Sequence, residues 1–419
     1  MNYRQTLEFL YGQLPMYQRQ GVSAFKKDLK NIKALLAYLE NPHTKLSCVH
    51  IAGTNGKGTV SHLVAGSIQA NGYRVGVYTS PHYMDFRERV KINGKLISSK
   101  YIVQFVEHIL PAIEQIQPSF FEMTVAMAFQ YFKDQEVDYA VIETGLGGRL
   151  DSTNVISPML SLITNIGFDH MDMLGDTLEQ IAFEKAGIIK RGVPVLIGEK
   201  QSKTTEVFKE VARDKDSTIY FAEDLVTIKD NHVKRLGQLD STSFKIDIDG
   251  PFIQKNLRTA IAAIHLLEIE GIPIEWSKVW GFLPKIGKKT YFLGRWQWIS
   301  NHPPILADSA HNCEGMEPVL TRIKGLGYSK IHFILGFSAN KDLESMLTLF
   351  PENGVYYFVK AKVPRGMDKE LLKEKAKEFG LLGKSYFSVR KALAAAKSKI
   401  KEDELIFVGG SIFTIAEVL

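Results

Sequence analysis

The sequence predicts an α/β protein in which a larger first domain, built on a mostly parallel sheet, is followed by a smaller α/β domain. At 419 residues the chain is too long for one ordinary hydrophobic core, so two domains are expected. Between residues 47 and about 198, short apolar runs alternate with helical segments, as in parallel sheets covered by helices. The same alternation returns from about residue 297 to the end.

The first alternating region supplies the strands and helices of the larger domain. Its strands are expected in the apolar runs SCVHIAG, RVGVYTS, VDYAVIETG, MLSLITNIG and VPVLIG. Helical patterns lie between them at residues 60–71, 100–116 and 124–133. Glycine and polar residues cluster directly after the strands, which is the edge where open parallel sheets bind ligands.

Residues 217–250 show a different pattern. The stretches TIYFA, LVTIKD, NHVKRL and SFKIDIDG are short, alternate in polarity and are broken by Asp-Asn and Asp-Gly pairs. This pattern predicts antiparallel hairpins. A helix is expected next at residues 254–270, because Gly271 and Pro273 follow it.

The last part of the chain predicts the second, smaller domain. Its strands are expected in PILADSA, KIHFILGF, GVYYFVK and ELIFVGG. We place the boundary between Gly294 and Arg295, which gives domains of residues 1–294 and 295–419.

Composition narrows the class of protein. A hydrophobic share of 45% and a charged share of 23% are those of a soluble globular chain. Cys48 and Cys313 are far apart and form no C-x-x-C pair, which argues against a disulfide framework or a cysteine-rich zinc site. No signal peptide or membrane-spanning run is found, so we expect a cytoplasmic protein. The net charge of +6 suits small anionic ligands, and neither nucleic acid nor a membrane is expected as a partner.

The segment HIAGTNGKGT, residues 50–59, is the most informative motif. An apolar run ends in a glycine-rich turn before a helical pattern, which is where backbone N–H groups and a helix N-terminus hold phosphate oxygens. Lys57 would reach the outer phosphates, and the hydroxyl of Thr59 could face a metal ion. The spacing differs from a standard Walker A motif, because Ile51 occupies a glycine position and Gly58 a hydroxyl position.

Three further polar segments follow strands of the first domain: YTSPH, ETGLGGRLDSTN and NIGFDHMD. Because strand ends of one sheet converge, Ser80, Glu143 and His170 are candidates to surround one ion. A hydroxyl, a carboxylate and an imidazole beside nucleotide phosphates fit Mg²⁺ with water completing the octahedron. Imidazole is an unusual magnesium ligand, so zinc and manganese stay as alternatives.

The motifs HIAGTNGKGTV, YTSPH, IETGLGGRLDSTN, FDHMDMLG, FEKAGIIKRG, ADSAHN and GGSIFT occur in one order along the chain. Together they resemble the folylpolyglutamate synthase / dihydrofolate synthase family of the Mur ligase superfamily. The resemblance extends from about residue 45 to the C-terminus. It implies a larger P-loop-type ATPase domain and a smaller Rossmann-like domain, with the active site in the cleft between them.

The resemblance also implies a reaction and its cofactors, ATP and Mg²⁺. In this family the carboxylate of the pterin substrate attacks the γ-phosphate of ATP and becomes an acyl phosphate. The amine of L-glutamate then attacks the acyl carbon and releases phosphate. Two anions approach each other in the first step, so cations and backbone dipoles must neutralise charge at the transferred phosphoryl group.

Family roles can be carried over to matching positions of this sequence. The residues that match ATP-binding positions are Asn55, Gly56, Lys57, Gly58, Thr59, Asn256, Arg295 and Asp308. The residues that match magnesium ligands are Ser80, Glu143 and His170. The residues that match parts of the pteridine or glutamyl site are Phe121, Glu122, Asp151, Ser152, Thr153 and Asn154.

Two further residues are expected to take part in the chemistry beside Lys57. Lys185 matches a lysine that is carbamylated in relatives, where the added carboxylate can serve a second magnesium ion. His311, next to the ADSAHN aspartate, is expected on the substrate side of the site. Arg295 stands at the domain boundary, where its charge would arrive when the domains close.

The sequence departs from the family at two places. The tail motif usually reads D-G-A-H-N-P, and this chain has Ser309 and Cys313 at the variable positions. The stretch FKKDLKNI, residues 25–32, keeps Asp28 and Leu29 but lacks the glycine of the dihydropteroate-contacting segment in many bifunctional members. Glutamate addition to tetrahydrofolate is therefore the expected activity, and addition to dihydropteroate is left open.

Two alternatives were weighed against this ligase. A peptidoglycan Mur ligase needs a large nucleotide-sugar domain ahead of its phosphate loop, and only 52 residues precede Gly53. A P-loop switch or binding module would use nucleotide without joining substrates. We expect a monomer with small-molecule partners: reduced folate, L-glutamate and ATP.

Overall fold

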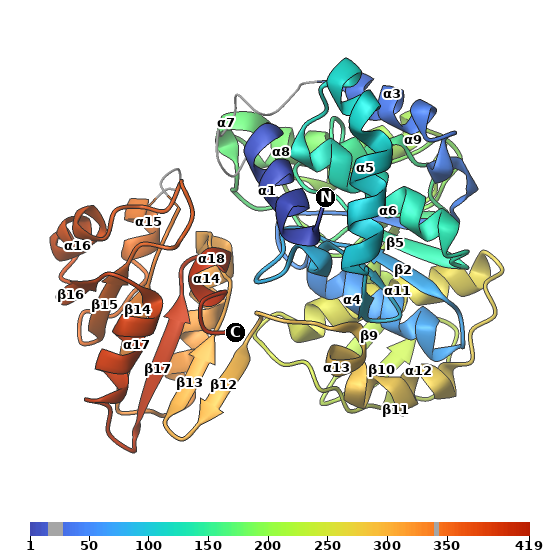
Figure 1. Cartoon of the computed structure of the whole chain (residues 1–419). Helices are drawn as coiled ribbons and strands as arrows, with labels where there is room; N and C mark the ends of the chain where they lie inside the picture. Colours follow the sequence, from blue (N-terminus) through green and yellow to red (C-terminus); the bar gives the residue numbers. More distant parts are fainter. Residues whose placement is uncertain (16–27, 339–342) are drawn as a thin grey trace. The chain divides into compact units, whose positions relative to one another are not determined.

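The computed structural model describes residues 1–15, 28–338 and 343–419 (Figure 1). It divides into two units. The first unit comprises residues 1–248 and 253–292, and the second comprises residues 249–252 and 293–419. The short segment 249–252 therefore belongs with the C-terminal part of the chain, although sequence placed it inside the first domain. None of the described helices is long and apolar enough to cross a membrane.

An eight-stranded sheet forms the centre of the first unit, in the order β4-β3-β2-β5-β1-β6-β7-β8. Its strands are β1 (Cys48–Ala52), β2 (Val75–Tyr78), β3 (Val90–Ile92), β4 (Lys95–Leu96), β5 (Tyr139–Glu143), β6 (Leu160–Ile163), β7 (Val195–Ile197) and β8 (Ile219–Phe221). Strands β2, β5, β1, β6, β7 and β8 run parallel to one another. Strands β3 and β4 are antiparallel and form one edge of the sheet. The predicted mostly parallel sheet is thus confirmed.

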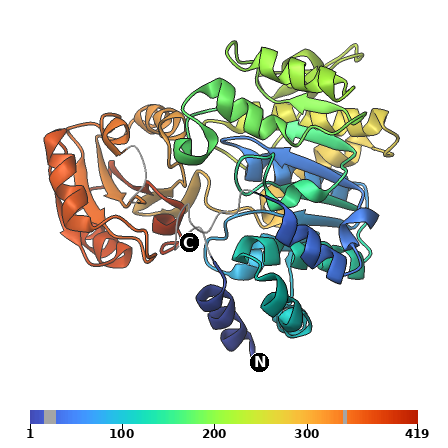
Figure 2. The same ribbon diagram turned by 90° about the horizontal axis from the view of Figure 1, so that it is seen from above.

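The helices of this unit cover both faces of the sheet (Figures 1 and 2). The longer ones are α1 (Tyr3–Gln13), α3 (Lys30–Tyr38), α4 (Lys57–Ala70), α5 (Ser99–Ile116), α6 (Phe120–Asp134), α8 (Leu178–Ala186), α9 (Thr205–Asp214) and α11 (Ile253–Ile269). The short ones are η2 (Pro42–Lys45), η3 (Phe86–Arg89), η4 (Ser152–Val155), α7 (Met171–Leu174), α10 (Ala222–Leu225), α12 (Trp276–Phe282), η5 (Leu283–Lys285) and α13 (Ile286–Thr290).

Alternation along the strands explains this two-sided packing. On β5, Ala140 and Ile142 belong to the core formed with α1, α3, α5 and α6. Val141 belongs to the opposite core, formed with α4 and α11. Successive side chains of a strand point to opposite faces, so an apolar run without polar interruption needs helices on both sides.

Strand register sets the level of the loops that leave the sheet. Ile51 of β1 pairs with both Glu143 of β5 and Leu162 of β6. The turn after β1 therefore begins beside the last residue of β5 and beside the C-terminal end of β6. This edge brings together the polar segments that follow those strands.

The predicted hairpins at residues 217–250 are correct only in the middle. The strands β9 (Val226–Lys229), β10 (His232–Arg235) and β11 (Thr242–Ser243) form an antiparallel sheet. The run TIYFA is instead β8, which pairs parallel to β7 at the edge of the large sheet. Residues 244–250 form no strand. Alternating polarity marks a half-exposed strand, and an edge strand of a parallel sheet is half-exposed too.

The second unit contains a six-stranded sheet in the order β12-β13-β17-β14-β15-β16. Its strands are β12 (Gln297–Asn301), β13 (Pro304–Ala307), β14 (Lys330–Leu335), β15 (Val355–Val359), β16 (Gly383–Tyr386) and β17 (Glu404–Gly409). Its helices are α14 (Cys313–Lys324), α15 (Leu343–Leu347), α16 (Lys369–Glu378), α17 (Val389–Lys397) and α18 (Ile412–Ile415). All neighbours except β12 and β13 pair in parallel, which confirms the predicted α/β character.

Candidate functional site

The turn between β1 and α4 has a backbone that only glycine fits at two positions. Gly53 has φ of 145° and Gly56 has φ of 84°. A Cβ atom on Gly53 would lie 1.9 Å from Thr164 Oγ1, and one on Gly56 would lie 2.4 Å from Asn256 Oδ1. The turn is thus packed tightly on its flanks. It leads into the N-terminus of α4, a suitable place for phosphate oxygens.

The start of this turn is tied to the segment that follows β6. The hydroxyl of Thr164 donates to the Asn55 carbonyl oxygen at 2.6 Å. The Asn55 N–H donates to Asn165 Oδ1 at 2.9 Å, and the Gly167 N–H donates to Thr54 Oγ1 at 3.0 Å. Sequence reasoning assigned no role to Thr164 and Asn165. Their position at the end of a strand beside the phosphate turn is the signal that could have found them.

Two lysine side chains converge on one carbonyl oxygen of the turn. Lys57 Nζ donates to the oxygens of Gly53 and Thr54 at 3.0 and 3.2 Å. Lys185 Nζ, from the last turn of α8, donates to the same Gly53 oxygen at 2.9 Å. The two lysines are 128 positions apart in the sequence, and their side chains meet at this oxygen.

Lys185 is a buried amine with an altered acidity. Its side chain is enclosed, and the residue is 4% exposed. Burial, and to a lesser extent the positive charge of Lys57, lower the pKa of Lys185 to about 7, although Asp169 and Asp151 oppose the change. A large share of the amine is therefore neutral near pH 7, which is the form that acts as a nucleophile.

Glu143 and Ser80 meet next to the phosphate turn. The Ser80 N–H donates to Glu143 Oε2 at 3.3 Å, and a Cβ atom on Gly58 would lie 3.7 Å from the same oxygen. Glu143 is only 4% exposed. A hydroxyl and a buried carboxylate are oxygen ligands of the kind Mg²⁺ prefers, with phosphate and water left to complete the octahedron. These two residues fit a magnesium ion.

His170 contacts its neighbour Asp169. It precedes α7 with φ of 53°, and its N–H donates to Asp169 Oδ1 at 3.1 Å. Asp169 in turn attracts the ammonium group of Lys185. Within residues 1–15, 28–338 and 343–419, no three His, Cys, Asp or Glu side chains form a metal-binding group. The structure thus joins Ser80 directly to Glu143, and Asp169, the residue before His170, is near enough for its charge to act on Lys185.

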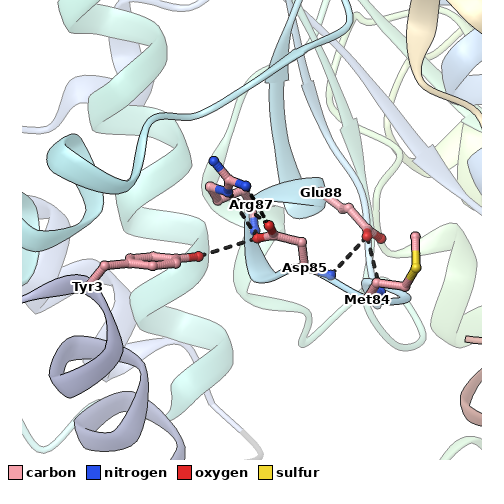
Figure 3. A network of polar contacts seen from close by, with 5 residues as sticks. All are labelled: Tyr3, Met84, Asp85, Arg87 and Glu88. Atoms are coloured by element: carbon pink, nitrogen blue, oxygen red, sulfur yellow. Dashed lines mark hydrogen bonds and ion pairs between the residues drawn. The ribbon is translucent and has the colours of Figure 1, made fainter. Parts of the chain in front are cut away.

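The loop from Ser80 to Asp85 is held by hydrogen bonds to Glu88 of η3. Glu88 accepts hydrogen bonds from the N–H groups of Tyr83, Met84 and Asp85 at 2.7, 3.1 and 2.9 Å. Figure 3 shows the Glu88 carboxylate turned toward Met84 and Asp85, and the Asp85 carboxylate held by Arg87 and by Tyr3 of α1. The loop that carries Ser80 is therefore fixed by carboxylates at both ends.

Asp151 holds the GLGG turn that follows β5. Its carboxylate accepts from the N–H groups of Gly145 and Leu146, and also from the backbone and hydroxyl of Thr153. Burial raises the pKa of Asp151 and these hydrogen bonds oppose the change. Asn154 donates to the carbonyl oxygens of Arg149 and Gly187. Asp151, Thr153 and Asn154 are buried, and Ser152 is half-buried.

The two predicted substrate residues of α6 have local structural contacts. The Ser119 N–H donates to Glu122 Oε2 at 2.7 Å, and the Glu122 N–H donates back to Ser119 Oγ, which forms a capping box. The ring of Phe121 packs on Gly145, where a Cβ atom would lie 2.4 Å from Phe121 Cζ. Sequence assigned both residues to substrate. The structure gives Glu122 the additional task of starting the helix.

Asn256 lies against the phosphate turn from the first turn of α11, as its close approach to Gly56 requires. Its neighbour Lys255 forms an ion pair with Glu199 at 2.7 Å. Glu199 also accepts from Asn165 Nδ2 at 3.0 Å. Sequence reasoning found Asn256 but missed Glu199, whose position after β7 continues the row of strand-end residues.

Asp308 in the second unit is buried in backbone contacts. Its carboxylate accepts from the N–H groups of Trp296 and Ala310, both at 2.7 Å. Burial raises the pKa of Asp308, and the charges of Arg295 and His311 oppose the change. The structure thus brings Arg295, Asp308 and His311 together within the second unit.

The stretch FKKDLKNI lies partly outside the described residues, because they resume only at Asp28.

Two family profiles match the chain. The Mur ligase middle domain matches residues 51–264, and the glutamate ligase domain of Mur ligases matches residues 294–412. The first match spans the phosphate turn and the strand-end residues around it. The second spans most of the second unit.

Similar proteins share the full length of the chain. A Bacillus subtilis dihydrofolate synthase/folylpolyglutamate synthase is 30% identical and covers 99% of this chain and 98% of its own length. A Lacticaseibacillus casei folylpolyglutamate synthase is 31% identical, with coverage of 100% and 98%. The structure of Escherichia coli FolC in complex with DHPP and ADP aligns with a TM-score of 0.87, 28% identity and coverage of 100% and 97%.

A second structure adds a metal and an amino acid. A bifunctional folylpolyglutamate synthase/dihydrofolate synthase with Mn, AMPPNP and L-glutamate bound aligns with a TM-score of 0.86 and 26% identity over 100% of this chain and 97% of its own. The seven sequence motifs, the two family profiles and these full-length relatives agree. This chain belongs to the folylpolyglutamate synthase/dihydrofolate synthase family of the Mur ligases.

Proposed function

We propose that this protein is an ATP-dependent ligase that joins L-glutamate to the carboxylate of a reduced folate. The reaction has two steps. A carboxylate oxygen of the folate attacks the γ-phosphorus of ATP, the bond to ADP breaks, and an acyl phosphate forms. The amine of L-glutamate then attacks the acyl carbon, an amide bond forms, and phosphate leaves with the proton of the amine transferred to solvent.

The convergence of charge on the turn after β1 is the observation that supports this proposal most. Lys57 and Lys185 share the Gly53 oxygen, and Glu143 lies next to Gly58. Lys57 beside the phosphate turn would neutralise the charge that builds up when a carboxylate attacks a phosphate, and the buried amine of Lys185 is placed next to it. A nucleotide switch needs phosphate binding, but it does not need a second buried amine at the same oxygen.

Individual residues take defined tasks in this scheme. The N–H groups of Gly56, Lys57, Gly58 and Thr59 bind the phosphates, and Lys57 stabilises the phosphoryl group during transfer. Ser80 and Glu143, with His170 nearby, would hold Mg²⁺. When bound, Mg²⁺ neutralises phosphate charge and orients the phosphate oxygens. Asn256 supports the turn, and Arg295 and Asp308 act from the second unit.

Lys185 is suited to carbamylation. Its neutral amine would attack CO₂, a nitrogen–carbon bond would form, and one proton would be released to solvent. Burial favours this step because it lowers the pKa of the amine to about 7. The resulting carbamate replaces a cation by an anion beside Lys57, which relieves the repulsion between the two lysines.

A paired acceptor assay tests the proposal. ADP release is measured with tetrahydrofolate, with dihydropteroate and with neither, each with and without L-glutamate. We expect full turnover only with tetrahydrofolate and glutamate together. Activity with dihydropteroate as well would make the enzyme bifunctional, as the B. subtilis relative is named. Nucleotide hydrolysis that is indifferent to both substrates would reject the ligase in favour of a switch.

A further inference from the structure

A buried lysine and a buried histidine lie near the phosphate turn. Neither of them has a role in the proposed reaction. Lys91 of β3 is 3% exposed, and His62 of α4 is 6% exposed. Lys91 Nζ lies 2.9 Å from His62 Nε2, and His62 Nδ1 lies 2.7 Å from the carbonyl oxygen of Gly58. A continuous path of hydrogen bonds therefore runs from the edge of the sheet to the phosphate turn.

The chemistry of the three groups fixes the direction of this path. A carbonyl oxygen only accepts, so His62 must carry its proton on Nδ1 and donate it to Gly58. A neutral imidazole then has a bare Nε2, which accepts from the ammonium group of Lys91. Burial lowers the pKa of His62 well below its ordinary value, and the charge of Lys91 adds to this effect, which keeps the imidazole neutral.

The positive charge of Lys91 has two carboxylates as counterions. Burial lowers the pKa of Lys91 to about 8, and the negative charges of Glu88 and Glu143 oppose that change. Glu88 fixes the lower end of the Ser80 loop (Figure 3), and Glu143 binds the Ser80 N–H. The charge of Lys91 is thus opposed by the charges of the two carboxylates that hold this loop.

The other end of the path reaches a peptide of the phosphate turn. The Gly58 oxygen and the Thr59 N–H belong to one peptide unit. A hydrogen bond to the oxygen polarises that unit and strengthens the N–H as a donor, by about 10–30% per bond. The Thr59 N–H lies in the first turn of α4, where amides have no partner inside the helix and are available to phosphate.

We propose that Lys91 and His62 are positioning residues of the nucleotide site, through which a buried positive charge polarises the Gly58–Thr59 peptide. Neither side chain needs to touch the nucleotide. This inference rests on the proposed function, because it assumes that the turn after β1 binds phosphate.

ADP affinity, measured by calorimetry without divalent metal, tests the pair. We expect K91M and H62L each to weaken ADP binding about tenfold. The double variant should be no weaker than the stronger single effect, because either change breaks the same path. K91R keeps the charge and should bind ADP within about threefold of the unchanged protein. In turnover assays, the KM for ATP should rise in K91M while the KM for L-glutamate stays constant.

A matched control separates positioning from general stability. His332 in the second unit is also buried, with Tyr357 and Glu404 as its two partners. H332L should lower the thermal midpoint but leave ADP affinity unchanged. If K91M and H62L bind ADP like the unchanged protein, or if K91R is as weak as K91M, the inference is overturned. If K91M does not fold, H62L alone decides.

The two proposals fail in different ways. Loss of acceptor dependence in the unchanged protein would reject the ligase, whatever the variants do. Unaltered ADP affinity in both variants, with acceptor-dependent turnover intact, would reject only the positioning role.

Discussion

Lys57 and Lys185 place two amine nitrogens on the Gly53 oxygen, and burial together with this crowding determines the chemistry of Lys185. Like charges at such short range in a buried site repel strongly, so one amine tends to lose its proton. Lys185 is the more enclosed of the pair, and its pKa of about 7 reflects that burial. Lys57 stays at the front of the turn, where it can follow the phosphoryl group.

Removing either charged group of the phosphate site should stop turnover without unfolding the chain. We expect K57A and E143A to lower kcat by about 10²- to 10³-fold, because each removes a charge that acts on the transferred phosphoryl group. Circular dichroism should match that of the unchanged protein. The surface variant E206A, which loses only an exposed ion pair with Lys209, serves as the control. Native activity in K57A or E143A would remove the nucleotide-site assignment.

Lys185 should matter through a carboxylate that it acquires. We expect K185A to lose turnover and to regain part of it with small carboxylic acids, which can occupy the space of the carbamate. Carbon-13 bicarbonate should give a carbamate signal in the unchanged protein and none in K185A. K209A, a change of an exposed lysine on α9, is the control for both readouts. Full native activity of K185A would contradict the assignment.

Among the elements, the turn after β1 depends on its neighbours more than on its own residues. Thr164 and Asn165 hold its first half, and Asn256 lies against Gly56. Thr164 and Asn165 follow β6 and Asn256 belongs to α11, so the shape of the turn exists only when β1, β6 and α11 are assembled. An isolated peptide of the motif would not keep it.

Two glycines with similar backbone angles should respond differently to alanine. Gly56 has φ of 84° and Gly72, after α4, has φ of 95°. An added Cβ would meet Asn256 at Gly56 but nothing within 4 Å at Gly72. Both changes should cost about 1–2 kcal/mol of unfolding free energy from the left-handed backbone. Only G56A should also weaken ADP binding, as measured by calorimetry. Equal ADP affinity in G56A and G72A would contradict this.

Sequence predicted those elements whose signal is local. The runs of β1, β2, β5, β6 and β7 are mostly apolar because both faces are buried, although His50 interrupts β1 and Ser161 interrupts β6. Helix α4 begins at Lys57, three residues before the predicted start at Val60, because the glycines of the turn hide the first helical residues. The misplacement of β8 has another cause. Parallel pairing with β7 depends on distant chain, which an alternating pattern does not reveal.

The candidate site, too, was predictable from sequence only where its signal is local. Ser80, Glu143 and Lys57 stand in motifs directly after strands, so their convergence follows from the sheet. The contact of Lys185 with Gly53 was accessible only through the resemblance, because α8 is remote in sequence. The pair formed by Lys91 and His62 has no motif at all. A lysine in β3 looks like an exposed edge residue until its partner on α4 is known.

At the scale of the whole molecule, buried histidines concentrate in the first unit. Burial lowers the pKa of His43, His50, His62 and His82, all of which belong to that unit. His50 and His82 reach a pKa of about 3. The first unit should therefore be the acid-sensitive part of the protein.

Stability should fall as pH drops below about 6.5. In the unfolded chain a histidine takes up a proton near that pH, whereas the folded state keeps His50 neutral down to about pH 3. The unfolded state then binds more protons, and the free energy of unfolding decreases with falling pH. At pH 5, His50 alone should account for about 2 kcal/mol. Urea unfolding at pH 5, 6, 7 and 8 measures this.

Two variants identify the source of the acid sensitivity. H50Q keeps a donor for Thr153 but no longer titrates, so its stability should depend less on pH. H232Q, the same substitution at an exposed histidine, is the matched control. If H50Q and the unchanged protein lose stability in parallel between pH 7 and pH 5, His50 is not responsible.

The segment 249–252 determines where this chain can be divided into separately expressed fragments. The chain passes from one unit to the other at residues 248/249, 252/253 and 292/293. Asp249 is paired with Arg322 at 2.7 Å, and a Cβ atom on Gly250 would lie 3.1 Å from Trp296 Cβ. A fragment that starts at Leu293 would lack both contacts, and a fragment that ends at Phe292 would keep Asp249 and Gly250 without their partners. Independent expression of the second unit therefore calls for a circular permutation or a linker that restores these four residues.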